Sequence, residues 1–205
     1  MKRVIFLICW LPWLCTSGYA QQYFPSEVWH EGRVSLLNGE ELRGKIKYNF
    51  EADVIQLSSN NTIQTYGARQ LLAFEIFDEE YGRYRQFFAL PYQVSTSYKV
   101  PMLFEVLYEN TLTLLSRETV EQETVPQYTY YGPQYGSRQR LAYEYYFLSP
   151  DGEIARYSQK KDELYQIMAQ HQAEMRQFIK TNRLKHDRRS DLVRITAYYN
   201  ELMNS

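Results

Sequence analysis

"RVSLLNGEELRGKIKYNF", residues 33–50, contains two runs in which apolar and polar side chains alternate, and Asn38-Gly39 lies between them. Alternation with a period of two places the apolar side chains on one face of a β-strand. An Asn-Gly pair between two such runs is a strong hairpin signal, because both central residues of a type I′ turn need positive φ. This stretch therefore predicts two antiparallel strands joined by a tight turn.

The same form recurs along the chain as far as residue 158. Further alternating runs are separated by turn signals at Asn60-Asn61, Gly82, Glu109-Asn110 and Pro150-Asp151-Gly152. Strands joined by tight turns pair with their neighbours in the chain, so about ten short strands form an antiparallel meander, as a curled sheet, sandwich or small barrel. We assign residues 21–158 to this domain. The predicted inward-facing residues are Val34, Leu36, Ile46, Tyr48, Ile55, Leu57, Leu72, Phe74, Ile76, Phe87, Phe104, Val106, Leu112, Leu114, Tyr145 and Phe147.

The alternation stops between residues 118 and 140, which predicts a 23-residue loop, longer than most loops in compact domains. Tyrosine can stack on a sugar ring or bury against a protein partner while its hydroxyl stays wet, and arginine adds polar contacts. The prolines, glycines and glutamines of this stretch are equally typical of a mobile segment, and both interpretations stay open. The candidate binding residues are Tyr128, Tyr130, Tyr131, Tyr135, Arg138 and Arg140.

The period changes after Ser158, and residues 159–205 are predicted to be helical. Asp162 and Glu163 favour a helix start, and a second helix is expected near Ser190, a residue type that caps helix N-termini well. The two helices form a hairpin that packs on the β domain, which makes the fold class α+β. The apolar positions at helical spacing are Leu164, Met168, His171, Met175 and Phe178 in the first helix and Leu192, Ile195, Tyr199 and Leu202 in the second.

A basic run, "KTNRLKHDRRSDLVR", covers the junction between these two helices. It could bind an anionic partner, such as a lipid headgroup or a polysaccharide, or it could pair with acidic residues of the sheet. Cations near the end of the first helix would also complement its dipole and solvate the turn. The residues proposed for an anionic-partner patch are Lys180, Arg183, Lys185, Arg188 and Arg189.

The N-terminus has the three parts of a secretory signal peptide. Lys2 and Arg3 form a positive start, residues 4–14 form an apolar core, and Gly18-Tyr19-Ala20 is a cleavage site. Cleavage after residue 20 removes both cysteines of the chain and leaves no transmembrane span. It also leaves 21 basic residues against 24 acidic ones, a net charge of −3, which does not indicate nucleic acid. We expect an exported protein of the periplasm or the exterior.

Catalytic and metal-binding motifs are missing from the sequence. The three histidines, His30, His171 and His186, are far apart and have no neighbouring ligand at a suitable spacing. The sequence has no G-x-S-x-G motif and no phosphate-binding glycine pattern, and its carboxylate pairs fall on hairpin turns. The sequence therefore predicts no catalytic residue, no metal and no cofactor.

The order of features resembles an uncharacterised family of exported envelope proteins of Bacteroidetes-type bacteria. The residues that carry this resemblance are "GKIKY" at 44–48, residues 104–115, "YYFL" at 145–148 and residues 191–202. The resemblance implies export and a β-rich body followed by helices, and it implies no catalytic residues.

Together these features predict an exported, non-enzymatic binding or structural module of the bacterial envelope that acts through protein–protein contacts. The expected partner is an envelope protein or a polysaccharide. A glycan-binding protein that uses the tyrosine-rich loop is one alternative. A hydrolase whose site is assembled from residues far apart in sequence is another, and it predicts a cleft with two or more titratable groups close together.

Overall fold

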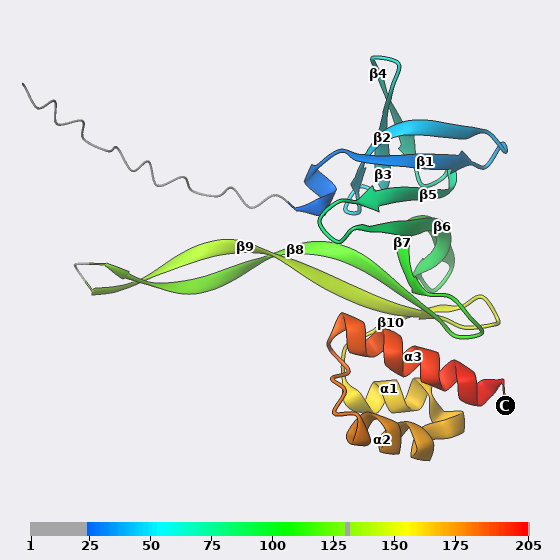
Figure 1. The fold of residues 1–205 in the computed structure, drawn as a ribbon, viewed down its shortest axis with the longest axis vertical. Helices are drawn as coiled ribbons and strands as arrows, with labels where there is room; N and C mark the ends of the chain where they lie inside the picture. The colour runs from blue at the N-terminus through cyan, green and yellow to red at the C-terminus, as the bar shows by residue number, and fades with distance from the viewer. Residues whose placement is uncertain (1–23, 130–131, 205) are drawn as a thin grey trace, which may run out of the picture.

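The computed structural model describes residues 24–129 and 132–204, and it is an antiparallel β-sheet followed by helices (Figure 1). This confirms the predicted α+β class. The signal peptide predicted over residues 1–20 lies outside the described residues, as do Tyr130 and Tyr131. The strands are β1 (His30–Leu36), β2 (Glu41–Asn49), β3 (Val54–Ser59), β4 (Thr62–Gly67), β5 (Leu71–Asp78), β6 (Arg83–Ser95), β7 (Tyr98–Tyr108), β8 (Thr113–Thr129), β9 (Gly132–Leu148) and β10 (Ile154–Tyr157). The helices are η1 (Pro25–Glu27), α1 (Lys161–Ile167), η2 (Ala169–His171), α2 (Gln172–Thr181) and α3 (Arg189–Met203), of which η1 and η2 are 3₁₀ turns.

The strands form one sheet in the order β10-β9-β8-β7-β6-β5-β1-β2-β3-β4. Neighbours in the chain are neighbours in the sheet, as expected for hairpins, with one exception. After β4 the chain crosses back and places β5 beside β1, where Gly32 pairs with Ile76 and Val34 with Phe74. The meander is therefore two runs of consecutive strands joined through the β1–β5 pair.

The predicted turns occur, but the turn at Asn38-Gly39 is of a different type. Gly39 has φ +86°, whereas Asn38 is not among the residues with positive φ, so a type I′ turn was the wrong prediction there. The Gly39 amide donates to the Leu36 carbonyl, so the turn spans residues 36–39 and leaves glycine alone in the left-handed region. The type I′ geometry instead occurs at Asn60 and Asn61, whose φ values are 50° and 61°.

Of the sixteen predicted inward-facing side chains, fourteen are buried. Val106 is half-buried, and the prediction for Leu72 was wrong, because this side chain is 51% exposed. Ser35 pairs with Ala73 but Leu36 pairs with Leu71, so an irregularity at this point leaves Leu72 unpaired and turns Leu71 inward.

The helices pack against the β8–β10 end of the sheet, which lies at the lower side of Figure 1. Their shared core joins Leu114, Phe147 and Tyr157 of the sheet to Leu164 and Leu192 of the helices. The first helix, expected to be continuous, instead breaks into α1, η2 and α2. The second starts at Arg189 with Arg188 in the N-cap position and no side-chain cap, so Ser190 is not the cap that the sequence predicted.

The long loop predicted over residues 118–140 was also wrong. β8 and β9 are 17 residues each and pair continuously from Thr113↔Leu148 to Thr129↔Gly132. Residues 119–129 and 132–142 form a two-stranded ribbon, which we call the arm. A ribbon exposed on both faces has no buried side, so its sequence shows no hydrophobic alternation. The missing alternation is why a loop was predicted for these residues.

Candidate binding site: the arm and the cleft at its root

The arm projects from the described body of the protein, and within the described residues its two strands pair only with each other (Figure 1). On one side, β7 pairs with β8 no further than Ser116. On the other side, β10 pairs with β9 no further than Tyr145. Beyond these two residues, no other described strand pairs with β8 or β9, so the arm presents two open strand edges and two faces.

One face of the arm carries charged pairs across the two strands. Arg140 donates to Glu121 at 2.9 Å and Arg138 donates to Glu123 at 2.8 Å. The hydrogen bond from Arg138 lowers the pKa of the Glu123 carboxyl. Arg138 and Arg140, which we proposed as binding residues, are thus paired with acids of the arm itself.

The opposite face of the arm has no charged side chain from Val120 to Thr124 on β8 or from Ser137 to Leu141 on β9. Tyr135 belongs to this face and is 80% exposed. Tyr128 is placed in β8, where it pairs with Pro133, but its side chain lies outside the description, as do Tyr130 and Tyr131 altogether. Of the four tyrosines proposed to bind, only Tyr135 can be located as an open aromatic surface.

Two prolines show which backbone groups of the arm point outward. Proline has no N–H, so Pro126 in β8 and Pro133 in β9 cannot donate within the β8–β9 ladder. Their positions have the same parity in the register, with Pro126 opposite Tyr135 and Pro133 opposite Tyr128. In an antiparallel pair alternate residues face away from the partner strand. The even-numbered residues of β8, and their partners in β9, therefore direct their backbone groups outward.

An ion pair lies where the strand pairing between β7 and β8 ends. Arg117 of β8 donates to Asp53 at 2.7 Å and to the Leu103 carbonyl of β7 at 2.7 Å, and the Leu103 amide donates to Asp53 at 2.8 Å. Arg117 also donates to the carbonyl of Phe50, whose ring lies under the guanidinium. Side chains thus replace the strand pairing that β7 would otherwise continue, and the edge of β8 is released from this point outward.

A cleft of about 750 Å³ lies where the edge of β8 leaves the sheet. Its walls come from η1, the end of β2, the start of β3 and the roots of β8 and β9. The volume is in the range typical of ligand pockets. Four of its lining residues are acidic and two are basic. These are Glu27, Glu51, Glu118 and Glu144, against Lys47 and Arg117.

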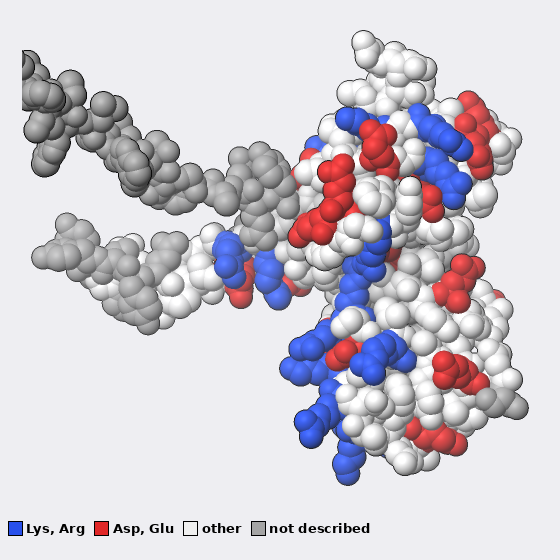
Figure 2. Space-filling view, viewed as in Figure 1, with Lys and Arg blue, Asp and Glu red and all other residues white. Residues whose placement is uncertain are grey.

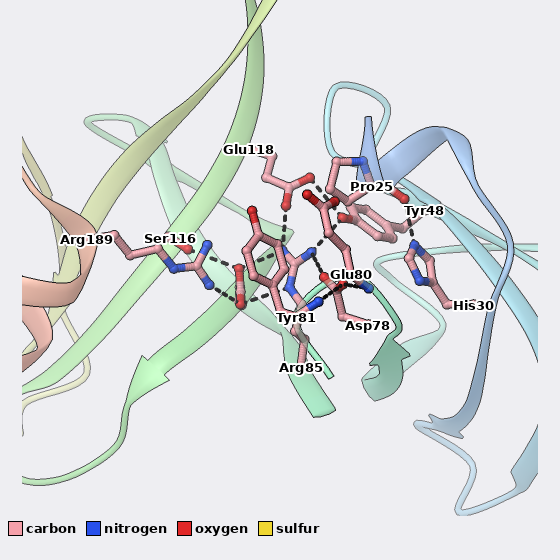
Figure 3. Close-up of polar contacts among 11 residues, drawn as sticks. Pro25, His30, Tyr48, Asp78, Glu80, Tyr81, Arg85, Ser116, Glu118 and Arg189 are labelled. Atoms are coloured by element: carbon pink, nitrogen blue, oxygen red, sulfur yellow. Dashed lines mark hydrogen bonds and ion pairs between the residues drawn. The ribbon is translucent and has the colours of Figure 1, made fainter. Parts of the chain in front are cut away.

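A buried charged cluster, drawn in Figure 3, lies beside this cleft. Two of its residues, Tyr48 and Glu118, line the cleft. The guanidinium of Arg85 lies 3.3 Å from Asp78, 2.7 Å from Glu105 and 2.5 Å from Glu118. It also donates to the Tyr48 hydroxyl, which in turn donates to Glu118 at 2.8 Å. All four charged side chains are 2–3% exposed. Among the described residues, every buried side-chain nitrogen or oxygen has a hydrogen-bond partner.

The helices join this cluster through Arg189, which donates to Glu105 and lies over the ring of Tyr143. Burial alone would raise the pKa of Glu105, but the hydrogen bonds and charges of Arg85 and Arg189 outweigh it and lower that pKa. Burial would likewise lower the pKa of Arg85, and its hydrogen bond to Glu105 raises it instead. Burial and the charge of Glu118 raise the pKa of Tyr48. At neutral pH Glu105 and Arg85 are therefore ionised and Tyr48 is neutral.

This ionisation pattern favours a structural role for the cluster. A general acid needs a carboxyl whose pKa is raised towards neutrality, and the pKa of Glu105 is shifted the other way. Each carboxylate is already held by an arginine. The cluster ties β2, β5, β6, β7, β8 and α3 together at the point where the arm begins.

The basic patch lies at the α2–α3 junction, and Figure 2 shows Lys and Arg side chains gathered along the side of the helical part below the arm. Lys180, Arg183, Lys185 and Arg188 are exposed there. Within the described residues none of these four forms an ion pair. Arg189 departs from the proposed patch, since its guanidinium turns inward to Glu105. Pairing with the protein's own acids therefore applies to Arg189 alone of the five.

The cluster, the ion pair of Asp53 with Arg117, and the cleft were not predicted from the sequence. Their residues are far apart in the chain and match no motif. One signal was present for Arg85, because it shares the strand face of Phe87, which was predicted to point inward. A charged side chain on an apolar face indicates a buried partner of opposite charge.

The described part of the chain holds no group of three or more His, Cys, Asp or Glu side chains placed to ligate a metal ion. Within residues 24–129 and 132–204, no helix has the length and hydropathy required to cross a membrane. The fold and the site define a curled antiparallel sheet with C-terminal helices and a projecting β-arm. Comparisons with models of protein families, with curated proteins and with solved structures find no match for this chain.

Proposed function

We propose that the chain is an exported, non-enzymatic binding module of the bacterial envelope, and that it contacts a protein partner through the arm. The observation that carries this proposal is the length of β8 and β9 beyond every strand that pairs with them. Unpaired strand edges attract further strands, and proteins normally keep them short or cover them. A ribbon with two open edges, along which no described strand pairs, is suited to contact with another chain.

The export half of the proposal rests on the signal-peptide pattern of residues 1–20 and on the resemblance to exported envelope proteins. A fusion of residues 1–30 to a reporter that is active only outside the cytoplasm tests it. The expected result is activity that is lost when Lys2 and Arg3 become glutamate and the apolar residues 5–8 become serine. An inactive fusion would contradict export.

The binding half is tested by deleting the arm. Residues 120–141 are replaced by Asn-Gly, so that Thr119 and Ala142, which pair in the native register, close a tight turn. We expect the circular dichroism of the remaining sheet and helices to be retained, because the removed residues pair only with each other. We expect the partners captured from envelope extract by the intact chain to be lost.

A control variant, Ile63→Ser, changes another open surface, since Ile63 is 62% exposed on the edge strand β4. It should capture the same partners as the intact chain. If the folded arm-less variant captures an unchanged set of proteins, the arm is not the binding element.

Tyr135 favours a second candidate function, which is glycan binding. An aromatic ring that is 80% exposed on an uncharged ribbon face can stack on a sugar ring. Saturable binding to a polysaccharide on a glycan array, weakened at least tenfold by Tyr135→Ala and little changed by Tyr84→Ala, would support it. Tyr84 is a suitable control because it is 65% exposed on β6, away from the arm. An array with no bound glycan would reject this candidate.

A further inference from the structure

We infer that the outer edge of β8, from Glu118 to Thr124, receives an extended segment of the protein partner as an added β-strand, and that this segment carries basic side chains at alternate positions. The inference rests on the proposed function, because it names the edge that the partner uses and the chemistry of the partner. Three observations select this edge.

The first observation is the direction of the backbone groups. Glu118, Val120, Gln122 and Thr124 have the same parity as Pro126, so their N–H and C=O groups point away from β9. No described strand pairs with them on that side, since the last residue of β8 that pairs with β7 is Ser116. These four residues provide a repeating set of donors and acceptors of the kind that an added strand uses.

The second observation is that the other edges are less suitable. At the root of β9 the Tyr143 carbonyl already accepts a hydrogen bond from the Gln159 side chain. Near the tip, Pro126 and Pro133 each remove an outward donor. The edge strand β4 is six residues long, the short length with which sheets limit unwanted pairing. The β8 edge between its root and Pro126 keeps all its donors.

The third observation is the cleft. The ion pair of Arg117 with Asp53 lies where β7 and β8 cease to pair, and a cleft of about 750 Å³ begins beside it, between residues 117–120 of β8 and the end of β2. A segment that pairs with β8 therefore enters the cleft at the root of the arm. The cleft surrounds that end of the segment, while the arm supports the rest.

Charge determines the chemistry of the segment. On the charged face of the arm, the β8 edge bears Glu121 and Glu123, and their arginine partners lie on the far strand. In the cleft, Glu118 and Glu144 are paired with Arg85 and Arg156, which leaves Glu27 and Glu51 against Lys47. Alternate residues of an added strand share the face that carries Glu121 and Glu123, and cross-strand pairs of opposite charge stabilise a sheet. Basic side chains two residues apart would fit this edge, and acidic ones would be repelled.

The test uses a blocked, fluorescein-labelled decapeptide in which lysine alternates with threonine, followed by fluorescence anisotropy at low ionic strength. The matched variants are Gln122→Pro and Gln139→Pro. Gln122 and Gln139 are exposed and directly opposite each other, and both have outward N–H groups, so neither proline breaks the β8–β9 ladder. Gln122→Ala removes the same side chain and keeps the N–H. Circular dichroism verifies that all three variants are folded.

We expect the peptide to bind the intact chain, Gln139→Pro and Gln122→Ala alike, and to bind Gln122→Pro at least tenfold more weakly. A peptide with glutamate in place of lysine should bind at least tenfold more weakly than the lysine peptide. The inference is overturned if the lysine peptide does not bind, if the two proline variants behave alike, or if the glutamate peptide binds equally well.

Partner capture separates this inference from the proposed function. If the arm-less variant loses the envelope partners and Gln122→Pro keeps them, the arm binds the partner by another surface and only the strand-addition inference fails. If both variants keep them, the proposed function fails as well. If both lose them while Gln139→Pro keeps them, both statements are supported.

Discussion

Replacing Arg85 by methionine tests whether the buried cluster holds the base of the arm to the sheet. Methionine is similar in length and apolar, so the change removes the charge without leaving a large cavity. Three carboxylates, those of Asp78, Glu105 and Glu118, lose an ion-pair partner that lies 2.5–3.3 Å away. Each of these carboxylates is only 2–3% exposed, so water cannot replace the lost charge.

The expected loss of stability depends on the hydrogen-bond partners that each carboxylate keeps. Glu105 keeps Arg189, Glu118 keeps the Tyr48 hydroxyl, and Asp78 keeps the backbone amides of Glu80 and Tyr81. Removing one partner of a buried ion pair costs about 3–5 kcal/mol. Since domains of this size unfold with about 5–15 kcal/mol, we expect a loss of roughly a fifth or more of the total free energy of unfolding.

Urea denaturation followed by circular dichroism at pH 7 and pH 5 measures this cost. Without Arg85 the main cause that lowers the pKa of the buried Glu105 carboxyl is gone, and burial then raises that pKa. An acid whose folded-state pKa is raised favours the folded state only when it is protonated. The difference between the intact chain and Arg85→Met should therefore shrink at pH 5. Arg85→Lys keeps a positive charge, but an ammonium group cannot donate to several acids in the planar arrangement of a guanidinium. Its stability should therefore lie between those of the intact chain and Arg85→Met. A cost below about 1 kcal/mol at pH 7, the level of an exposed ion pair, would refute the reasoning, as would a cost that grows towards low pH.

Two further predictions concern single buried polar side chains, Glu105 and Asn200. Because the folded-state pKa of Glu105 is lowered, its stabilising effect is complete above the unfolded pKa of about 4.3 and is lost as the pH falls through the folded value. Glu105→Gln should cost about 1.5–3 kcal/mol at pH 7, and its urea midpoint should converge with that of the intact chain below pH 4; a constant gap would argue against this assignment. Asn200, 1% exposed, pairs with both the amide and the carbonyl of Leu112 at 2.8 and 2.9 Å, so Asn200→Ala should cost about 1–3 kcal/mol for each backbone group left unpaired. A change within about 0.5 kcal/mol in its thermal denaturation would contradict this.

The strands of the body could be predicted because each has one buried face. Val34, Ile46 and Tyr48 alternate with polar neighbours, and the turn residues between strands are of the expected types. The crossover that places β5 beside β1 could not be predicted, because any two strands with one apolar face can pair and the tight turns specify only neighbours. The helix break at Met168 is compatible with an unbroken apolar stripe, so periodicity did not reveal it.

The arm and the cleft are where reasoning from the sequence fell short, for two physical reasons. The pairing in the arm is stabilised by its backbone ladder and by cross-strand pairs such as Glu121 with Arg140, neither of which leaves an apolar pattern. The cluster around Arg85 depends on contacts between residues 20 and 33 positions apart, which become neighbours only once the strand order is known. The tyrosine-rich segment was recognised as unusual, but its extended conformation was not.

The mutual pairing of β8 and β9 also bears on how proteins with this architecture can diverge. Because residues 119–129 pair with β9 and with no other described strand, a gain or loss of two residues in each strand of the arm would keep every side chain on its present face and leave the strand pairing of the body unchanged. Each such step would change the reach of the arm by about 7 Å. A single-residue change in one strand would reverse the two faces beyond it. Length variation among descendants of this chain should therefore occur in matched pairs within the arm, and reach could evolve independently of stability.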